Sequence, residues 1–378
     1  MEQGVDAIIL AGTNKYRWLE EIGEDCKPFI EIGGRTLVEY VIDAALECPD
    51  ISRTYVVTDV ERLEALLAKR RFDVPDKLKI VPQHDSFLGN IRYPFLYDVL
   101  PDAGFSRIEK GETPEQYVKR NPEATEQKVV GLYSDSPFIR GIDISRFIET
   151  SEESYPEADY VIGFAYDKPI REIEEHLDRE LCTPETKSAL FFLDGTMTRA
   201  NNLLYGKPLK LPHEVWDIAQ NVYDNRKFLD EQGGHRIKKW LSQAKTPFKY
   251  VMIHPSKRPT ITWGFLTGVY HFLMFGLANL TKSQVPYVLS KKEERERVVY
   301  RMSGNKAVAR INICDVTLPT FDIDNPRFLS MLRENDCELF YKLQTCPRNY
   351  PFESDEQFEK LQDYLRWCVR GHDEVLSF

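Results

Sequence analysis

The chain has 378 residues, of which 42% are apolar and 12% aromatic, with only 20 glycines and 22 prolines. This composition excludes collagen-like, low-complexity and largely disordered proteins, and the length suits two or three domains or one large α/β domain with insertions. The net charge is −10, and no basic block is longer than residues 69–71, so we expect no nucleic acid as a partner.

The cysteines and the N-terminus both predict an intracellular protein. Seven cysteines are scattered along the chain without a C-x2-C pair, which argues against a zinc ribbon or a disulfide framework. The N-terminus has no cationic region, and its apolar run at 7–11 is too short for a signal peptide. We therefore expect reduced thiols and a cytoplasmic location.

The first half of the chain alternates short apolar runs with amphipathic segments. A continuous apolar run at 5–11 predicts a buried parallel strand, because strands covered on both faces lose their polar alternation. Residues 36–46 have apolar side chains at helical spacing and predict a helix. Strands are predicted further on at 53–58, 78–81, 128–133, 159–166 and 189–193, and helices at 61–71 and 142–150. This order predicts an α/β fold with a Rossmann-like, doubly wound, mostly parallel sheet, whose ligands bind at the carboxyl ends of the strands.

The pattern changes after residue 206, which ends the first part of the predicted core, 1–206. Long helix-like segments over 207–300 predict a mainly helical insertion. Strand-like sequence then returns, so 301–333 is predicted to be the closing strand and helix of the core. Residues 334–378 form an acidic and aromatic segment that we expect to be a helical tail.

One stretch of the insertion, 261–280, contains no charged side chain over a length close to the roughly 20 residues of a membrane span. Three glycines and His271 interrupt it, and the strands on both sides of it must meet in one sheet, which argues against a true span. A helix buried against the core or a partner subunit is the favoured interpretation. An interfacial helix that contacts a membrane or a lipid-like acceptor is the alternative.

The first predicted strand ends in a glycine turn that several cations follow. A tight glycine turn lets backbone N–H groups approach triphosphate oxygens, and nearby cations offset the charge of those oxygens and of a leaving pyrophosphate. The residues of this candidate nucleotide site are Leu10, Ala11, Gly12, Thr13, Lys15, Arg17 and Lys27.

The spacing of these residues resembles the signature loop of the MobA-like NTP transferases, the nucleotidyltransferases that resemble molybdenum-cofactor guanylyltransferase. Their pattern is roughly L-A-G-G-x-S-x-R followed by K-P, so Arg17 falls on the arginine and Lys27 on the lysine. Thr13 replaces the second glycine and Lys15 the small polar residue. The next residues, 28–37, look like the family's hairpin that enters the first helix.

The resemblance implies a magnesium site. Asp135 follows the fourth predicted strand at the position of the family's metal aspartate, where a carboxylate can hold Mg²⁺ against the α-phosphate. The segment 320–329 is similar to the family's closing D-x-D-x-P-x-x-L motif. Alternation places Asp322 and Asp324 on one face of a strand, so at least one can join Asp135, while the other can cap a helix that starts at Pro326. Arg17, Lys27 and Asp135 are then the expected catalytic residues.

The remaining candidate residues concern the base and the acceptor. Gln83, Gly89 and Asn90 follow the third strand, where the family reads the base and ribose, although capping of a helix is an equal alternative. Asn201 and Asn202 lie where the family often has an acceptor-side segment, and their amides suit an acceptor phosphate or ribose hydroxyls. Loop capping is again the alternative.

The sequence therefore predicts a Mg²⁺-dependent nucleotidyltransferase that transfers NMP from an NTP to a phosphorylated or hydroxyl small-molecule acceptor and releases pyrophosphate. Two alternatives stay open. In the first, the chain is an inactive nucleotide-binding or membrane-associated interaction protein on the same fold. In the second, it is a GT-A-like glycosyltransferase. The second needs D-x-D at the fourth strand, which residues 134–137 do not supply.

Overall fold

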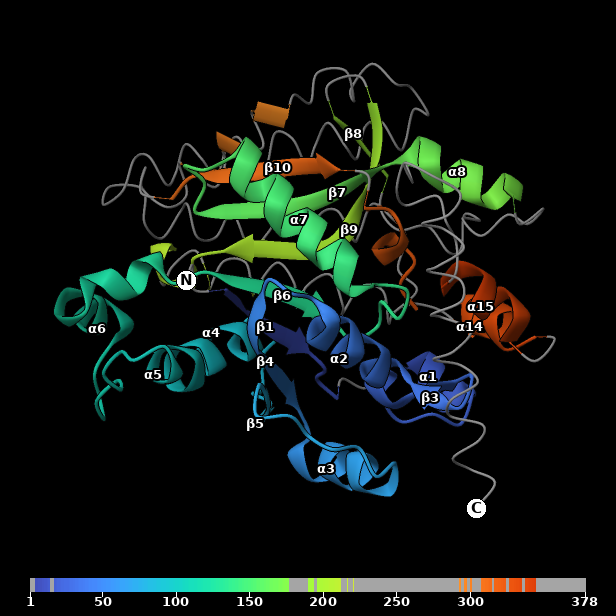
Figure 1. Cartoon of the computed structure of the whole chain (residues 1–378), viewed down its shortest axis with the longest axis horizontal. Coiled ribbons are helices and arrows are strands. Elements are labelled where there is room, and N and C mark those ends of the chain that lie inside the picture. The colour runs from blue at the N-terminus through green and yellow to red at the C-terminus, as the bar shows by residue number, and fades with distance from the viewer. Residues whose placement is uncertain are drawn as a thin grey trace.

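The computed structural model describes most of the predicted core. The described residues are 4–13, 17–176, 190–193, 196–211, 216, 220, 292–293, 296–297, 300, 307–314, 316–323, 326–334 and 337–344. They form an eight-stranded sheet with helices on both faces, which confirms the predicted α/β fold (Figure 1).

The strands of the sheet run in the order β10-β7-β9-β6-β1-β4-β5, and β8 pairs with β9. Their bounds are β1 (Val5–Leu10), β4 (Ile51–Thr58), β5 (Leu78–Pro82), β6 (Val129–Tyr133), β7 (Tyr160–Tyr166), β8 (Leu190–Leu193), β9 (Thr196–Gly206) and β10 (Ala309–Cys314). The pairs of β1 with β4 and β6, of β4 with β5 and of β10 with β7 are parallel, whereas β9 is antiparallel to β6, β7 and β8. The carboxyl ends of β1, β4, β5, β6, β7 and β10 therefore lie at one edge of the sheet.

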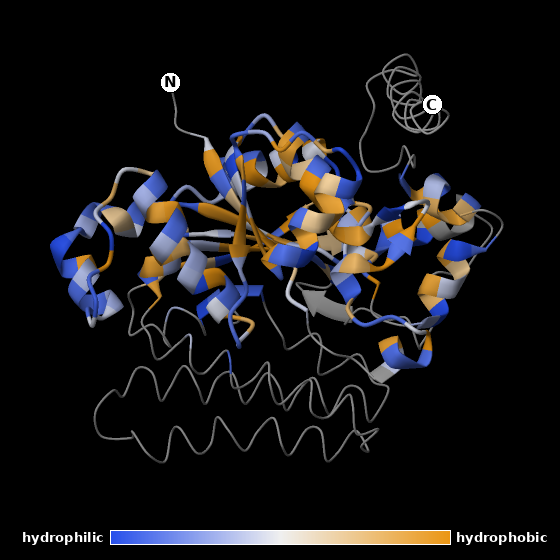
Figure 2. Ribbon diagram, turned by 90° about the horizontal axis from the view of Figure 1, so that it is seen from below, coloured by the Kyte–Doolittle hydropathy of each residue, from blue (hydrophilic) through white to orange (hydrophobic). Residues whose placement is uncertain are grey.

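Helices cover the sheet on both sides because the strands are apolar on both sides. On one face of the sheet, Ala7 and Ile9 of β1 pack in a cluster with residues of α2 (Leu37–Glu47), α3 (Val60–Lys69) and α7 (Gly141–Ser154). On the other face, Ile8 and Leu10 pack in a cluster with residues of α4 (Gly89–Pro94), the π-helical segment η2 (Phe95–Val99), α5 (Leu100–Asp102) and α6 (Pro114–Arg120). Figure 2 shows the apolar residues gathered in the central strands, between helices whose outer faces are hydrophilic. The continuous apolar run of the first strand has this physical origin.

A separate apolar cluster joins the start and the end of the described chain near the carboxyl edge. It includes buried residues such as Leu19, Ile30, Phe138 and Phe340. Its elements are α1 (Arg17–Glu21), β2 (Glu31–Ile32), the start of α2, α8 (Asp167–His176), the 3-10 helix η5 (Leu318–Thr320), α14 (Pro326–Arg333) and α15 (Glu338–Gln344). The 3-10 helix η1 (Lys27–Phe29) precedes β2, which pairs with β3 (Arg35–Thr36) in a hairpin. The predicted hairpin and the helix that begins at Pro326 are both present.

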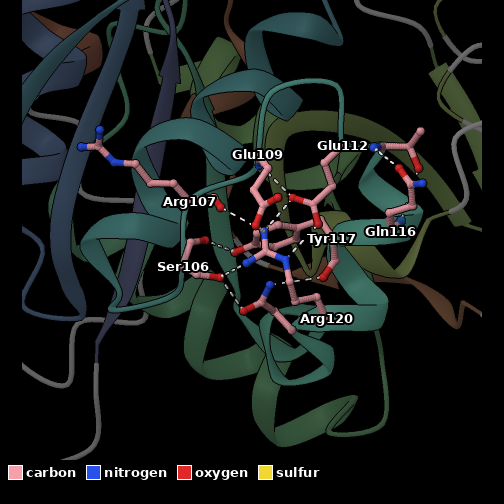
Figure 3. Close-up of polar contacts among 9 residues, drawn as sticks. Ser106, Arg107, Glu109, Glu112, Gln116, Tyr117 and Arg120 are labelled. Atoms are coloured by element: carbon pink, nitrogen blue, oxygen red, sulfur yellow. Dashed lines mark hydrogen bonds and ion pairs between the residues drawn. The ribbon is translucent and has the colours of Figure 1, made fainter.

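The segment between α5 and β6 is held by a polar network around α6 (Figure 3). Arg120 donates to the carboxylate of Glu112 at 2.6 Å, to Ser106 Oγ at 2.7 Å and to the carbonyl of Arg107 at 3.0 Å. The buried Tyr117 donates its hydroxyl to the carbonyl of Ser106 at 2.8 Å. In Figure 1, α6 lies on the opposite side of the molecule from α14 and α15. We assign this network to structure and not to the candidate site.

Several predicted segments lie partly or wholly outside the described residues. The stretch 261–280 is not described, and the insertion 207–300 and the tail 334–378 are described only in part. Near the end of the insertion, Glu296 is helical and accepts the backbone N–H of Ile311 in β10 at 2.8 Å. Among the described residues, no helix combines the length and the apolar character that a membrane crossing requires.

Candidate active site

The carboxyl edge of the sheet collects the segments that the sequence singled out. Gly12 and Thr13 follow β1, Gln83 follows β5 and Asp135 comes two residues after β6. The connector that follows β10, residues 316–323, reaches the same edge. In doubly wound folds ligands bind at this edge, so it is the candidate active site.

The glycine turn is fixed by a side chain from a distant strand. The backbone N–H of Thr13 donates to Gln83 Oε1 at 2.7 Å, and Gln83 Nε2 in turn lies 2.6 Å from Thr13 Oγ1. Gln83 is itself held at the sheet, because its backbone N–H donates to the carbonyl of Thr58 at the end of β4. The sequence singled out Thr13 and Gln83 separately and did not predict that they form a reciprocal pair. This pairing needs an oxygen-bearing side chain at position 13, where the resembling family has glycine.

Part of the cationic loop lies outside the described residues. These are 14–16, which include Lys15, and the side chain of Arg17, although Arg17 begins α1. Leu10 and Ala11 are buried, and the N–H of Ala11 donates to the carbonyl of Val57 at 3.0 Å. The roles of Lys15 and Arg17 therefore stay predictions.

Lys27 and Asp135 form an ion pair at the centre of the site. Lys27 Nζ lies 2.8 Å from Asp135 Oδ2, and the exposed fractions of the two side chains are 7% and 20%. Lys27 is the first residue of η1, and Pro28 follows it in the first turn, where proline is favoured. All three residues of this short helix are buried. A further backbone bond brings in the connector, because the N–H of Ile323 donates to the carbonyl of Asp135 at 2.9 Å. Three segments that are far apart in the sequence thus meet at Asp135.

The carboxylates of Asp135 and Asp322 are oxygen ligands of the kind that suits Mg²⁺ bound together with a nucleotide. Asp322 directly precedes Ile323, so its backbone lies beside that of Asp135. Within the described residues there is no group of three or more His, Cys, Asp or Glu side chains placed to hold a metal. Mg²⁺ is commonly bound by one or two carboxylates together with phosphate oxygens and water, so Asp135 and Asp322 fit a metal–nucleotide complex and not a cage made only of protein.

The expected strand around the second carboxylate is not formed. Residues 321–323 have no regular secondary structure, and Asp324 lies outside the described residues. The preceding η5 contains Pro319, which has no N–H, and Thr320 donates both its N–H and its hydroxyl to the carbonyl of Thr317. These local bonds replace the extended pairing that would set Asp322 and Asp324 on one face.

The base-side residues make local contacts that shape a turn. Asn90 is buried, and its Oδ1 accepts the backbone N–H of His84 at 2.5 Å. Gly89 begins α4 and donates its N–H to Ser86 Oγ at 3.0 Å; a Cβ at Gly89 would lie 2.5 Å from that oxygen. The N-cap of α4 is Leu88, which makes no side-chain cap, and Ser86 bonds only the first helical N–H. Base recognition by Gly89 and Asn90 stays a prediction.

Burial also bears on nucleophilic chemistry at this edge. Cys26 precedes Lys27 and is buried, and burial raises the pKa of its thiol to about 12. A thiol with so high a pKa is neutral at physiological pH and a poor nucleophile. Cys26 is therefore better suited to packing than to covalent catalysis.

Asn201 and Asn202 lie in β9 at the same edge, in contact with the connector after β10. Asn201 is fully buried; its Nδ2 donates to the carbonyl of Val316 at 3.3 Å, and its Oδ1 accepts the N–H of Leu203 at 3.3 Å. Asn202 Nδ2 lies 3.2 Å from the carbonyl of Pro319. An acceptor contact by Asn201 would have to exchange these bonds.

The sequence did not single out Ser136, Pro319 and Ile323 as members of the site. Each acts through its backbone or through a contact with another segment, and neither feature leaves a pattern in a single sequence. The same holds for a buried ion pair after β7, in which Arg199 Nε lies 2.9 Å from Asp167 Oδ1.

Comparison with known proteins gives distant structural similarity. No protein-family model matches this chain, and no curated protein sequence matches it. A solved structure described as a hypothetical transferase from Thermus thermophilus is 18% identical, with 86% of this chain and 99% of that chain covered and a TM-score of 0.49. A CMP:2-keto-3-deoxy-manno-octonic acid synthetase in complex with CTP is 14% identical, with 61% and 86% covered and a TM-score of 0.33.

A third solved structure, 4-diphosphocytidyl-2C-methyl-D-erythritol synthase, is 12% identical, with 57% of this chain and 80% of that chain covered and a TM-score of 0.33. These three similarities are all below 25% identity and below a TM-score of 0.5.

Proposed function

We propose that this chain is a Mg²⁺-dependent nucleotidyltransferase that resembles the MobA-like NTP transferases. The observation that carries the proposal is the ion pair between Lys27 and Asp135, which lies beside the connector that bears Asp322. A buried cation and two carboxylates at the carboxyl edge match the needs of a metal-bound triphosphate. The Gly12 turn after β1 adds backbone N–H groups at the same edge.

The chain's own residues act by positioning and charge. Backbone N–H groups of the turn bind phosphate oxygens, and Lys27 moves its ammonium group from Asp135 towards the phosphates and offsets the charge of the departing pyrophosphate. Asp135 and Asp322 hold the metal ion. When bound, Mg²⁺ supplies charge stabilisation at the α-phosphate. An acceptor hydroxyl or phosphate oxygen then attacks the α-phosphorus in line, and no protein nucleophile takes part.

The other predicted contacts complete the proposal. Arg17 and Lys15 bind the triphosphate, Gln83, Gly89 and Asn90 face the base and ribose, and the acceptor lies towards β9. The sequence further supports three parts of this proposal: a cytoplasmic location, a small-molecule acceptor, and a subunit or membrane contact through 261–280. The two alternative functions make different predictions for the same assay.

Pyrophosphate release tests the proposal. The purified chain is incubated with each of the four nucleoside triphosphates, Mg²⁺ and a panel of phosphorylated and hydroxyl acceptors, and the Asp135→Asn variant serves as the control. We expect release with one nucleotide and one acceptor class, and loss of release with chelator or in the variant. Nucleotide binding without release would favour the inactive binding protein, and turnover of nucleotide sugars would favour the glycosyltransferase.

A further inference from the structure

The strand β9 carries an irregularity at the edge of the candidate site. Ile162 of β7 pairs with Leu204, but Phe164 pairs with Ala200, so three residues of β9 oppose only Gly163. Asn202 lies inside this bulge with φ of +56°. Few non-glycine residues adopt the left-handed conformation, although asparagine does so more readily than most. Bulges of this kind redirect side chains and are frequent beside active sites.

Asn201 locks the bulge from within the sheet. A Cβ on Gly163 would lie 2.0 Å from Asn201 Oδ1, so the asparagine occupies space that only glycine leaves open. The amide donates to Val316, which starts the connector, and also lies 3.5 Å from the Sγ of Cys314 at the end of β10. The first part of the connector is thereby tied to β9.

Asn202 ties the middle of the connector to the segment of Asp135. Its Nδ2 lies 3.2 Å from the carbonyl of Pro319 and 3.4 Å from Ser136 Oγ. Ser136 is buried, directly follows Asp135, and donates its hydroxyl to the same carbonyl of Pro319 at 3.4 Å. One carbonyl of the connector is therefore shared by β9 and by the residue next to the proposed metal ligand.

The end of the connector is held at the same place. Ile323 donates its N–H to the carbonyl of Asp135 at 2.9 Å, four residues after Pro319. Asp322 lies between these two attachment points. Residues 321–323 have no regular secondary structure, so these attachments hold the backbone that carries Asp322.

We propose that Asn202, supported by Asn201, is a positioning residue that holds the connector against the Asp135 segment and so sets Asp322 beside Asp135. The inference rests on the proposed function, because it gives the two carboxylates a shared metal ion. It replaces direct acceptor binding as the role of these amides. A backbone conformation that is held by several bonds at a site edge is typical of strain retained for function.

The test uses Asn202→Gly, which keeps the positive φ and removes the amide. The matched control is Arg71→Gly, because Arg71 also has a positive φ, of 54°, and lies after α3, away from the connector. The first measurement is hydrogen exchange of the Ile323 amide in the full chain. We expect faster exchange at Ile323 in Asn202→Gly and no change there in Arg71→Gly.

The second measurement is Mn²⁺ binding, followed by electron paramagnetic resonance, with a non-hydrolysable nucleoside triphosphate present. Outer-shell partners of metal ligands commonly contribute 10-fold to 100-fold in metal affinity, so we expect Asn202→Gly to weaken Mn²⁺ binding by about 10-fold. Nucleotide affinity without metal should stay the same.

Two results would overturn the inference. Unchanged exchange at Ile323 would show that Asn202 does not hold the connector. Faster exchange with unchanged Mn²⁺ affinity would show a role in folding alone, or in acceptor binding if the acceptor KM rises. A wild-type chain that binds no Mn²⁺ with nucleotide would instead contradict the proposed function, and the exchange measurement would still report on the connector.

Discussion

Lys27 Nζ lies 2.8 Å from Asp135 Oδ2, although the two residues are 108 positions apart in the sequence. Lys27 lies on the short buried helix η1, and Asp135 follows the central strand β6. Both charges lose hydration at this position, and their pairing offsets that cost. In the proposed reaction Asp135 would hold the metal ion in place of the Lys27 ammonium group, and Lys27 would then contact the phosphates.

Asp135→Asn keeps the size of the side chain and removes its charge. We expect turnover to fall by at least about 100-fold, because a neutral amide holds Mg²⁺ poorly at the reacting phosphate. The amide oxygen still accepts a hydrogen bond from Lys27, but the buried ammonium group loses its charge partner, so we also expect a lower melting temperature and compare turnover where both proteins are folded. Steady-state pyrophosphate release measures the first effect, with Asp43→Asn, which alters an ion pair of α2 with Arg35, as the control. Turnover within a few-fold of wild type would remove Asp135 from the metal site.

Lys27→Met should separate phosphate binding from metal binding. Loss of a charge-assisted bond to the phosphates should weaken metal-free triphosphate binding by about 1.5–3 kcal/mol. Binding of Mn²⁺ alone should stay equal or tighten, because the competing ammonium group is gone. Calorimetric titration gives both values, and Lys79→Met, which breaks the ion pair of Lys79 with Asp102, is the control. A variant that loses metal affinity would contradict the exchange of partners at Asp135.

The reciprocal bonds between Gln83 and Thr13 should appear as coupling in a double-mutant cycle. Thr13→Val removes the bond to Gln83 Nε2 and keeps the bond from the backbone N–H, whereas Gln83→Leu removes both bonds, so either change should weaken nucleotide binding. The double variant should lose little more than Gln83→Leu alone, with an interaction free energy of about 0.5–3 kcal/mol. Nucleotide affinities of the four proteins, measured in parallel, complete the cycle. Strictly additive losses would mean that the two residues act independently.

Arg120→Ala should loosen the segment around α6 and leave the active site intact. Arg120 joins Glu112, Ser106 and the carbonyl of Arg107 in the network of Figure 3, so its removal should speed proteolytic cleavage between residues 103 and 127. Nucleotide binding and turnover should equal those of wild type. Arg146→Ala, which breaks an exposed ion pair within α7, controls for loss of a surface arginine. Reduced turnover in Arg120→Ala would place this segment in the function of the protein.

Glu126 should contribute to stability in a pH-dependent way. Hydrogen bonds from Lys207 and then Lys210 lower the pKa of Glu126 from 4.5 to about 2. Because the pKa is lower in the folded state, this stabilisation is complete above about pH 4.5 and is lost as the pH falls towards 2. The carboxylate is more than half exposed, so we expect a small effect.

The comparison uses urea unfolding of wild type and Glu126→Gln at pH 6 and at pH 3. The wild type should be the more stable at pH 6, and the difference should shrink at pH 3, where Glu126 is mostly protonated in the unfolded chain and mostly ionised in the folded one. Effects of other groups cancel in the difference. A difference that grows on acidification would contradict the lowered pKa.

Local patterns in the sequence determined most of the regular elements near the N-terminus and the chemical types at the carboxyl edge. The apolar run of β1, the helical spacing of α2 and the proline that starts α14 each depend on neighbours within a few residues, and each prediction is confirmed. Parallel strand order then placed Gly12, Gln83 and Asp135 at one edge without further information.

Only the tertiary structure decided which of these residues meet. The partners of Asp135, Thr13 and Asn202 are 66 or more positions away in the sequence, and such contacts depend on how strands and loops pack. The predicted strand around Asp322 was wrong because local bonds of η5 and the tie of Pro319 to β9 outweigh alternation. Alternation of polar and apolar residues reports burial of one face, whereas the position of a carboxylate depends on the hydrogen bonds that hold its backbone.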